Sequence, residues 1–325
     1  MADGINVNGG IKGFARKVIN VPRKLKFVNA GTEFKGLTSP TYRLGNYIRN
    51  TSRTQADMRR WGRLGLALNY LKTEVNVRTY LPKYQDTEKN IKVIDEKELT
   101  IHTRDEIKVK VSQVEPPKDE VEYPANSSVF LIENDMLFSA FDLYSKKEDW
   151  IQPWVVFALT ILEHLKETKF CPDVIHCNEW QTGLLPIYLK ALYGLNDNGF
   201  YANTSSLFAV HNHKHLGLFP EDQWQLLLLL GDLYFHDALG LNNQVSLLKA
   251  GMMYSDKVIF NSEEELGSAI SDADIQEMGK FVGQLKEKGK AVGILPKKID
   301  IYETLPEDYI KNVVGIYLGL IRGEK

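Results

Sequence analysis

The chain has 325 residues, of which 43% are hydrophobic, and this is enough to fill the core of one large domain or two smaller ones. The formal net charge is only −2, so no strong overall field selects a polyanionic partner such as nucleic acid. The charge is uneven, however: residues 1–63 carry 13 Lys and Arg against 3 Asp and Glu, and the remainder carry 27 against 39. The basic region either binds nucleic acid, phosphate or an anionic surface, or is a solvated or helical segment that lies against the acidic body.

Several features of the sequence predict a cytoplasmic protein. The first residues, MADGINVNGGIKGF, lack the apolar stretch of a signal peptide, and residues 1–23 are predicted to form a flexible basic tail. The longest apolar run, LLLLLG over 226–231, is far shorter than the ~20 residues that cross a membrane. Cys171 and Cys177 have neither redox nor zinc-site spacing, which favours reduced thiols. We therefore expect neither a membrane nor a nucleic-acid partner.

The first half of the chain beyond the tail predicts strands, one helix and a hairpin. LKFVNAG (25–31) predicts a buried strand, RRWGRLGLALNYLK (59–72) an amphipathic helix, and VNVRTYLP (75–82) a second strand closed by proline. Residues 89–124 contain KVIDEKELTIHT and EIKVKVSQV, which alternate polar and apolar residues and so indicate an antiparallel hairpin inserted on the sheet. SVFLIEND (128–135) predicts another buried strand.

The second half alternates helices and strands more regularly. A helix is predicted first, followed by strand and helix in turn, over residues 151–167, 173–177, 182–194, 206–212, 244–254 and 256–262. Ser262 and Glu265 have the spacing of a capping box at the start of a further helix. Apolar strands that alternate with helices predict an α/β fold, a Rossmann-like doubly wound parallel sheet.

Open parallel sheets bind ligands at the carboxyl ends of their strands, and this rule selects three loops. They contain TEFKGLTSP after the strand at 25–31, HCNEW at the end of the strand at 173–177, and HNHKHLGLFP at the end of the strand at 206–212. The last loop places His211, His213 and His215 at every second position, so an extended chain could present three imidazoles to zinc. Alternatively the strand ends at Asn212, and one histidine enters the site while the other two lie on a solvated loop.

Two other positions in these loops have side chains suited to sugar or phosphate. Glu179 beside Trp180 is either an acid or sugar-hydroxyl acceptor against an aromatic platform, or a carboxylate favoured by a helix N-terminus. Lys35 and Gly36 follow the first strand, where a phosphate would meet a cation and backbone N–H groups. An ordinary turn lysine would give the same pattern, because the loop lacks a full glycine motif.

These loops belong to longer phrases that resemble one known family. PDVIHCNEWQTGLLPIYLKALYG resembles PDIVHCHDWQTALVPVYLK, and FAVHNHKHLGLFP resembles FTIHNLAYQGLFP. KLKFVNAGTEF, VNVRTYLPKY, NNQVSLLKAGMMYSDKVIFNS and GILPKKID also have counterparts in the same order, so the resemblance covers about residues 24–300. The family is that of the bacterial glycogen and plant starch synthases, glycosyltransferase family 5. The resemblance implies the N-terminal half of a GT-B fold, which has two Rossmann-like domains.

The resemblance also implies an activity. Members of the family move glucose from a sugar nucleotide, usually ADP-glucose, to the end of an α-1,4-glucan with retention at the anomeric carbon. They need no metal or other cofactor, which argues against zinc at the histidines. His211 and Asn212 match the family's HN pair against the transferred glucose and Glu179 matches the aspartate of HDW, so these three are the predicted catalytic residues. The predicted substrate-binding residues are Lys35, Gly36 and Trp180.

The sequence departs from the family at several motif positions. The phosphate-binding K-T-G-G-L loop is represented only by FKGL at 34–37, two residues short, or by WGRLG at 61–65, which lacks the lysine. Glu179 is one methylene longer than the family's aspartate, and Pro296 replaces the asparagine of GILNGID. Changes at all three candidate loops favour a catalytically inactive module for the isolated chain.

Domain boundaries also follow from the resemblance. Residues 24–295 are predicted to form the synthase-type N-terminal domain and residues 296–325 a linker and a C-terminal helix, with the second GT-B domain absent. That second domain holds most of the nucleotide pocket in the family. We therefore expect a glucosyltransferase domain that is active only with a separate C-terminal domain protein. The alternative is a catalytically inactive module that binds glucan or a synthase and regulates it.

Overall fold

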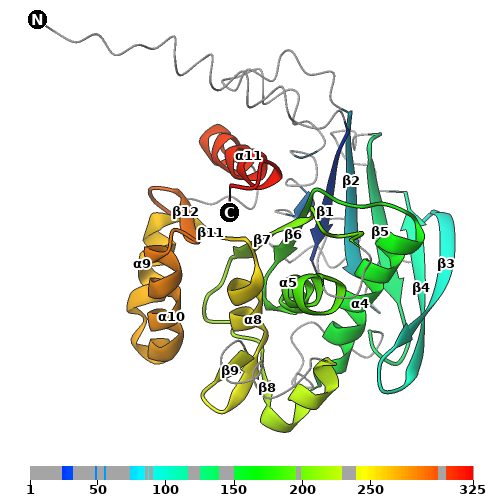
Figure 1. The fold of residues 1–325 in the computed structure, drawn as a ribbon, viewed down its shortest axis with the longest axis horizontal. Coiled ribbons are helices and arrows are strands. Elements are labelled where there is room, and N and C mark those ends of the chain that lie inside the picture. Colours follow the sequence, from blue (N-terminus) through cyan, green and yellow to red (C-terminus); the bar gives the residue numbers. More distant parts are fainter. Residues whose placement is uncertain are drawn as a thin grey trace, which may run out of the picture.

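The fold is described from a computed structural model of the chain (Figure 1). The described residues are 24–31, 48–49, 55, 74–84, 87, 91–115, 125–138, 150–194, 199–228, 239–298 and 305–324. The predicted basic tail, the predicted helix over 59–72, and the candidate residues Lys35 and Gly36 lie outside these ranges.

A nine-stranded sheet runs through the molecule in the order β12-β11-β7-β6-β1-β2-β5-β4-β3. Its parallel strands are β1 (Lys24–Ala30), β2 (Glu74–Pro82), β5 (Ser127–Glu133), β6 (Val174–Asn178), β7 (Ser205–Val210), β11 (Lys257–Ser262) and β12 (Ala291–Leu295). The chain runs outward from β1 through β2 to β5 and then returns to β6 on the other side of β1. The sheet is therefore doubly wound, and the predicted α/β fold class is confirmed.

Helices cover both faces of this sheet. Successive strand residues point to opposite faces, so Phe27 belongs to the core on one side and Val28 to the core on the other. α4 (Gln152–Glu167), α5 (Leu184–Tyr188) and α8 (Leu247–Tyr254) cover one face, and α11 (Glu307–Ile321) covers the other (Figure 1). Burial on both sides explains why every residue of β7, SSLFAV, is buried.

Helix α4 confirms the helix predicted over 151–167. Pro153 lies in its first turn, where the missing N–H costs no intrahelical hydrogen bond. The helix ends at Glu167, and the hydroxyl of the following residue, Thr168, donates to the carbonyl oxygen of His164 at 2.6 Å. Its apolar face includes Trp154 and Ile161, which are both buried in the core beside the sheet.

The predicted hairpin is also confirmed. β3 (Val93–His102) and β4 (Glu106–Val114) pair antiparallel at the edge of the sheet, and β4 pairs antiparallel with β5. Val109 and Val111 are buried, whereas the alternate residue Lys110 lies 3.3 Å from Glu96 across the hairpin. The polar and apolar alternation in the sequence therefore corresponds to one exposed and one buried face.

Two predicted boundaries are wrong. The strand predicted over 206–212 ends at Val210, because a side chain takes the next two backbone N–H groups, as described below. The helix predicted over 244–254 begins only at Leu247, where the Ser246 hydroxyl accepts the Lys249 N–H at 3.2 Å. The three preceding residues form a strand instead.

That strand, β10 (Gln244–Ser246), belongs to a small antiparallel sheet with β8 (Leu218–Pro220) and β9 (Gly240–Leu241). Asn242 and Asn243 connect β9 to β10 with φ of 51° and 59°. Two positive-φ residues are what a two-residue hairpin of type I′ requires, and asparagine tolerates them better than most residues do. No hairpin was predicted here from the sequence.

Shorter elements complete the described fold. The helix predicted over 182–194 consists of a 3₁₀ turn (Trp180–Thr182), α5 and a π turn (Leu189–Tyr193). Ser262 caps α9 (Glu263–Ser271) by accepting the Glu265 N–H at 3.1 Å. The remaining elements are the 3₁₀ turns Glu221–Leu227 and Ala273–Ile275, and α10 (Gln276–Glu287).

Helix α11 lies within the stretch predicted to be a linker and C-terminal helix. It packs against β6, β7 and β12 and contributes Tyr309, Val313 and Tyr317 to the core of its face of the sheet. α11 is therefore part of the same folded layers as the strands, while the division at residue 295 stays a prediction. Among the described residues, none of the helices has the length and apolar character that crossing a membrane requires.

Candidate functional site

The carboxyl ends of β1, β6 and β7 meet at the point where the strand order reverses. β1 pairs with β2 on one side and with β6 on the other, and β6 pairs with β7. Crevices for ligands form at such a point, because the connections leave the sheet in opposite directions. The loops after β6 and β7 are described, whereas the loop after β1, with Lys35 and Gly36, lies outside the described residues.

The structure brings Glu179, His211 and Asn212 together. The Glu179 Oε1 atom accepts the backbone N–H of His211 at 2.5 Å and that of Asn212 at 2.8 Å. Glu179 is only 6% exposed and has φ 64° and ψ 172°, a conformation that residues other than glycine rarely adopt. The carboxylate therefore fixes the backbone of the next loop, and the side chains of His211 and Asn212 start from a fixed position at the rim.

Asn178 determines the orientation of the His211 ring. Its side-chain N–H donates to the carbonyl oxygen of Ala30 at 2.9 Å, which leaves its Oδ1 atom as an acceptor 3.3 Å from His211 Nε2. His211 Nε2 therefore carries a hydrogen, and Nδ1 has the lone pair in the neutral ring. Burial lowers the pKa of His211 to about 3, although a hydrogen bond with Asn261 acts in the opposite direction. The ring is a neutral hydrogen-bonding group at pH 7, not a proton donor of acidic strength.

The other two histidines of the loop have different surroundings. His213 Nε2 lies 3.1 Å from Asp272 Oδ2, and His215 Nε2 lies 3.3 Å from the Asn212 side-chain nitrogen. Past Val210 the chain is no longer extended, so alternate residues no longer share a face. Within the described ranges, no group of three His, Cys, Asp or Glu side chains is placed to hold a metal ion.

Trp180 lies against the core beside the rim. Its ring is 5.2 Å from the Trp154 ring and 5.8 Å from the Phe219 ring, measured between centroids. Gly217 has φ 56°, and a Cβ atom there would come within 2.6 Å of the Trp180 ring. The indole is therefore enclosed by protein on several sides, which gives it a supporting position under the loop that carries His211.

Sequence reasoning assigned no role to two features near the rim. Ile48 is fully buried, and a Cβ atom added to Gly31 would lie 2.1 Å from its Cδ1 atom, so an apolar side chain covers the end of β1. Asn178 lies in HCNEW, and the only sign of a role in the sequence was that it is a polar residue at the end of a predicted strand. Nothing in the sequence indicated a role for Ile48, because no sequence pattern relates its segment to Gly31.

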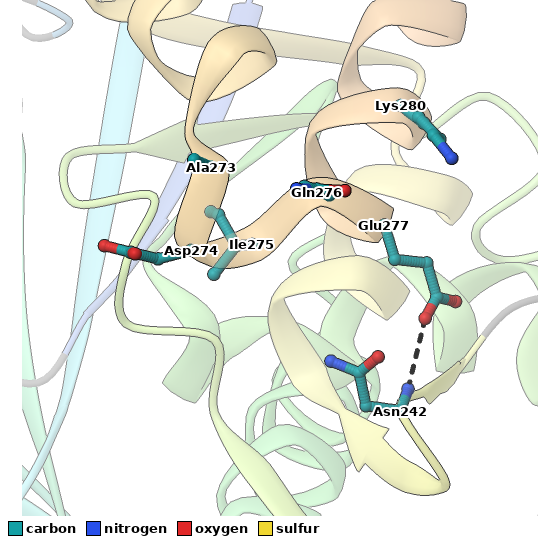
Figure 2. A pocket seen from close by; sticks show the side chains of 7 residues that line it. All are labelled: Asn242, Ala273, Asp274, Ile275, Gln276, Glu277 and Lys280. Carbon is teal, nitrogen blue, oxygen red and sulfur yellow. Dashed lines mark hydrogen bonds between the residues drawn. The ribbon is translucent and has the colours of Figure 1, made fainter.

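A hollow of about 400 Å³ lies between the β9–β10 turn and the start of α10 (Figure 2). Its lining is mostly polar and consists of Asn242, Ala273, Asp274, Ile275, Gln276, Glu277 and Lys280. The backbone N–H of Asn242 donates to Glu277 Oε2 at 3.3 Å across it. None of the candidate site residues lines this hollow, which is therefore separate from the rim.

Comparison with known proteins identifies the same region. The starch synthase catalytic domain family matches residues 62–268, which include Glu179, His211 and Asn212. A glycogen synthase of Moorella thermoacetica is 34% identical over 134 residues, covering 41% of this chain and 27% of the relative. A glycogen synthase of Thermotoga petrophila is 28% identical over 256 residues, covering 76% of this chain and 50% of the relative. The chain thus spans at most about half the length of these relatives.

A solved structure has a similar fold. The catalytic domain of starch synthase IV from Arabidopsis thaliana, bound to ADP and acarbose, superposes with a TM-score of 0.63 at 17% identity. The match covers 85% of this chain and 52% of that one. The nine-stranded, mostly parallel sheet is thus the Rossmann-like α/β fold of that domain, and the matched residues span more than half of this sequence. The chain belongs to the starch synthase catalytic domain family, glycosyltransferase family 5.

Proposed function

We propose that this domain is the acceptor-side half of a glucosyltransferase that extends α-1,4-glucan from ADP-glucose with retention, and that its activity requires a complementing C-terminal domain. The transfer breaks the bond from glucose C1 to the diphosphate and forms a bond from C1 to the hydroxyl oxygen at the glucan end. The hydroxyl proton leaves with the diphosphate. Support comes from the family, and from the ADP and acarbose bound to the starch synthase IV domain.

The contact of Glu179 with the backbone of His211 and Asn212 is the observation that carries this proposal. It holds two neutral hydrogen-bonding side chains at the switch point of the sheet, where a sugar would lie. His211 offers a neutral imidazole and Asn212 an exposed amide to glucose hydroxyls, while Glu179 acts through the backbone. Lys35 and Gly36 would meet the diphosphate, and Trp180 would support the loop from beneath. Positioning and electrostatic stabilisation of the leaving diphosphate account for the catalysis.

The test is transfer of radiolabelled glucose from ADP-glucose to glycogen. The chain is assayed alone and mixed with the purified C-terminal catalytic domain of a related glycogen synthase. We expect incorporation only in the mixture, and a His211→Ala change to lower it on the order of a hundredfold. His102→Ala, on the exposed hairpin, is the matched control and should leave the rate unchanged. Equal rates for both variants would refute the assignment of His211.

The Lys35 assignment has its own test. Lys35→Ala should weaken ADP binding to the mixture, because the change removes a cation from the diphosphate. The measurement is titration calorimetry with ADP. Unchanged ADP affinity would remove Lys35 from the proposed site without affecting the sugar-binding residues.

The second candidate function is a catalytically inactive module that binds glucan or a synthase. Ile48 favours it, since an apolar side chain covers the end of β1, where the family's phosphate-binding loop begins. Retention of the chain on immobilised glycogen, with no transfer in any mixture, would support this function over the enzyme. Changing Ile48 to Ala should then leave glucan retention intact.

A further inference from the structure

The loop of residues 211–217 is held firmly at its two ends. At its start, the Glu179 carboxylate accepts two backbone N–H groups. At its end, the carbonyl oxygen of Leu216 accepts the Ser246 hydroxyl at 2.8 Å, and that of Gly217 accepts the Leu247 N–H at 3.0 Å. These contacts use buried backbone beside β6 and α8, so the ends of the loop cannot move without breaking the core.

The middle of the loop is held differently. Its backbone makes a local turn, in which the Lys214 N–H donates to Asn212 Oδ1 at 3.1 Å and the His215 N–H donates to the Asn212 carbonyl oxygen at 3.1 Å. Among the described residues, the hydrogen bonds and ion pairs that the side chains of His213, Lys214 and His215 make outside the loop go to Asp272 and Asp274. Beyond Asn212, whose N–H the Glu179 carboxylate accepts, the polar contacts that hold the turn of residues 213–215 to the rest of the described fold therefore go through this one connection.

Of these contacts, the one between His213 and Asp272 is the most protected from solvent. The two side chains are 19% and 10% exposed and lie 3.1 Å apart. Lys214 is 59% exposed and lies 3.4 Å from Asp272 and 3.7 Å from Asp274, the latter 84% exposed. Exposed ion pairs of that kind contribute little, because water and salt screen them. His213 is thus the main side chain that connects the loop to Asp272.

Asp272 is itself fixed by the start of the next element. Its Oδ1 atom accepts the Asp274 N–H at 3.0 Å and so caps the 3₁₀ turn that leads into α10, where Figure 2 shows Asp274 and Ile275. Its Oδ2 atom remains for His213 and Lys214. The Asp274 N–H, and then His213 and Lys214, lower the pKa of Asp272. Asp272 is a fixed carboxylate, and this suits it to hold the His213 side chain.

We propose that His213 and Asp272 are positioning residues for sugar recognition at the rim. Their contact keeps the turn of residues 213–215 in place, and this turn orients the exposed Asn212 side chain because the Lys214 N–H donates to its Oδ1 atom. The proposal rests on the proposed function. Without the contact, only a fraction of molecules would present Asn212 correctly, and apparent sugar affinity falls by that fraction. The family phrase FTIHNLAYQGLFP has other residues at the positions of His213, Lys214 and His215. The contact between His213 and Asp272 is therefore a feature of this chain and not of that phrase.

The experiment compares three variants of the full chain. His213→Ala removes the contact, His213→Gln keeps an N–H donor at the position of Nε2, and Lys214→Ala is the matched control. Hydrogen exchange of the amides of residues 213–215 reports whether the loop loosens in the absence of ligand. Glucose transfer in the mixture with the C-terminal domain gives KM for ADP-glucose and kcat separately. We expect His213→Ala to accelerate exchange and to raise KM about tenfold with kcat nearly unchanged.

The other two variants should behave like the original chain, within about twofold in KM, because one keeps the donor and the other removes only an exposed pair. Unchanged exchange in His213→Ala would overturn the proposal. Faster exchange with an unchanged KM would also overturn it, while leaving the proposed function intact. Absence of transfer by the original chain in every mixture is the failure of the proposed function and removes the positioning role with it, whatever the exchange data show about the contact.

Discussion

Glu179 combines three properties at the residue scale: it is buried, it has φ 64°, and its carboxylate accepts two backbone N–H groups. Strained backbone of this kind persists only where the surrounding structure imposes it, and such positions gather at functional sites. The position one residue past β6 explains the strain, since the chain must turn from the strand into the 3₁₀ turn that starts at Trp180 while the carboxylate reaches the end of β7.

Glu179→Ala should lower the free energy of unfolding by about 3 kcal/mol, because two part-buried N–H groups lose a charged acceptor. Glu179→Gln keeps one acceptor oxygen and should lower it by only about 1 kcal/mol. Urea unfolding at neutral pH measures both. Equal stability of the two variants would show that the carboxylate does not hold the loop.

Gly217→Ala tests the close approach to Trp180. The change places a methyl group 2.6 Å from the indole at a residue with φ 56°, so both overlap and backbone strain oppose it. Gly199 is the matched control, since its φ is 83° and nothing lies within 4 Å of an added Cβ. Gly199→Ala should cost about 1 kcal/mol and Gly217→Ala about 3 kcal/mol in unfolding free energy. Similar losses for the two would mean that the indole moves away freely.

At the scale of elements, a buried polar network attaches α11 to the sheet. The Tyr317 hydroxyl pairs with His176 Nδ1 at 2.7 Å and accepts the Gln55 side-chain N–H at 2.9 Å, and Gln55 also pairs with Asn29. Three segments that are distant in the sequence thus meet beneath α11. All four side chains are fully buried, so each hydrogen bond replaces one that water would otherwise supply.

Tyr317→Phe should lower the free energy of unfolding by about 2 kcal/mol, because it leaves a buried imidazole nitrogen and a buried amide with fewer partners. Tyr188→Phe is the matched control: this tyrosine is also fully buried, and its hydroxyl has no hydrogen-bond partner within the described part of the chain. That change should be neutral or slightly stabilising. Thermal or urea unfolding measures the change in unfolding free energy of both variants. Equal changes would exclude a role of the network in holding α11.

At the scale of the whole molecule, buried histidines make stability depend on pH. Burial lowers the pKa of His164 to about 4 and that of His176 to about 3, from the ordinary 6.5. Nearby Arg78 acts in the same direction on His164, and His211 on His176. The unfolded chain therefore binds protons near pH 6.5, while the folded chain does so only in more acidic solution.

Stability should be complete above about pH 6.5 and fall as the pH is lowered, by about 2 kcal/mol per buried histidine at pH 5. Urea unfolding at several pH values measures the slope. His164→Gln removes one of these groups and should flatten the decline between pH 6.5 and pH 5, even where it lowers stability at pH 7. An unchanged slope would show that His164 takes up its proton equally in both states.

The sequence by itself determined the order and type of most elements and the family. Residue periodicity is local, so β1, β2, α4 and the β3–β4 hairpin could be predicted from polar and apolar patterns, and the phrases around HCNEW and HNHKHLGLFP identified the synthases. The same patterns placed the candidate residues Glu179, His211 and Asn212 at strand ends, where a parallel sheet binds ligands.

Only the tertiary structure decided which atoms these residues contact. The Glu179 carboxylate ends β7 by binding N–H groups 32 and 33 positions away, and Tyr317 meets His176 across 141 positions. The contact between His213 and Asp272 likewise joins a loop to a helix start 59 positions later. Such contacts depend on how the strands are ordered and how the layers pack, and a local pattern of residues contains neither.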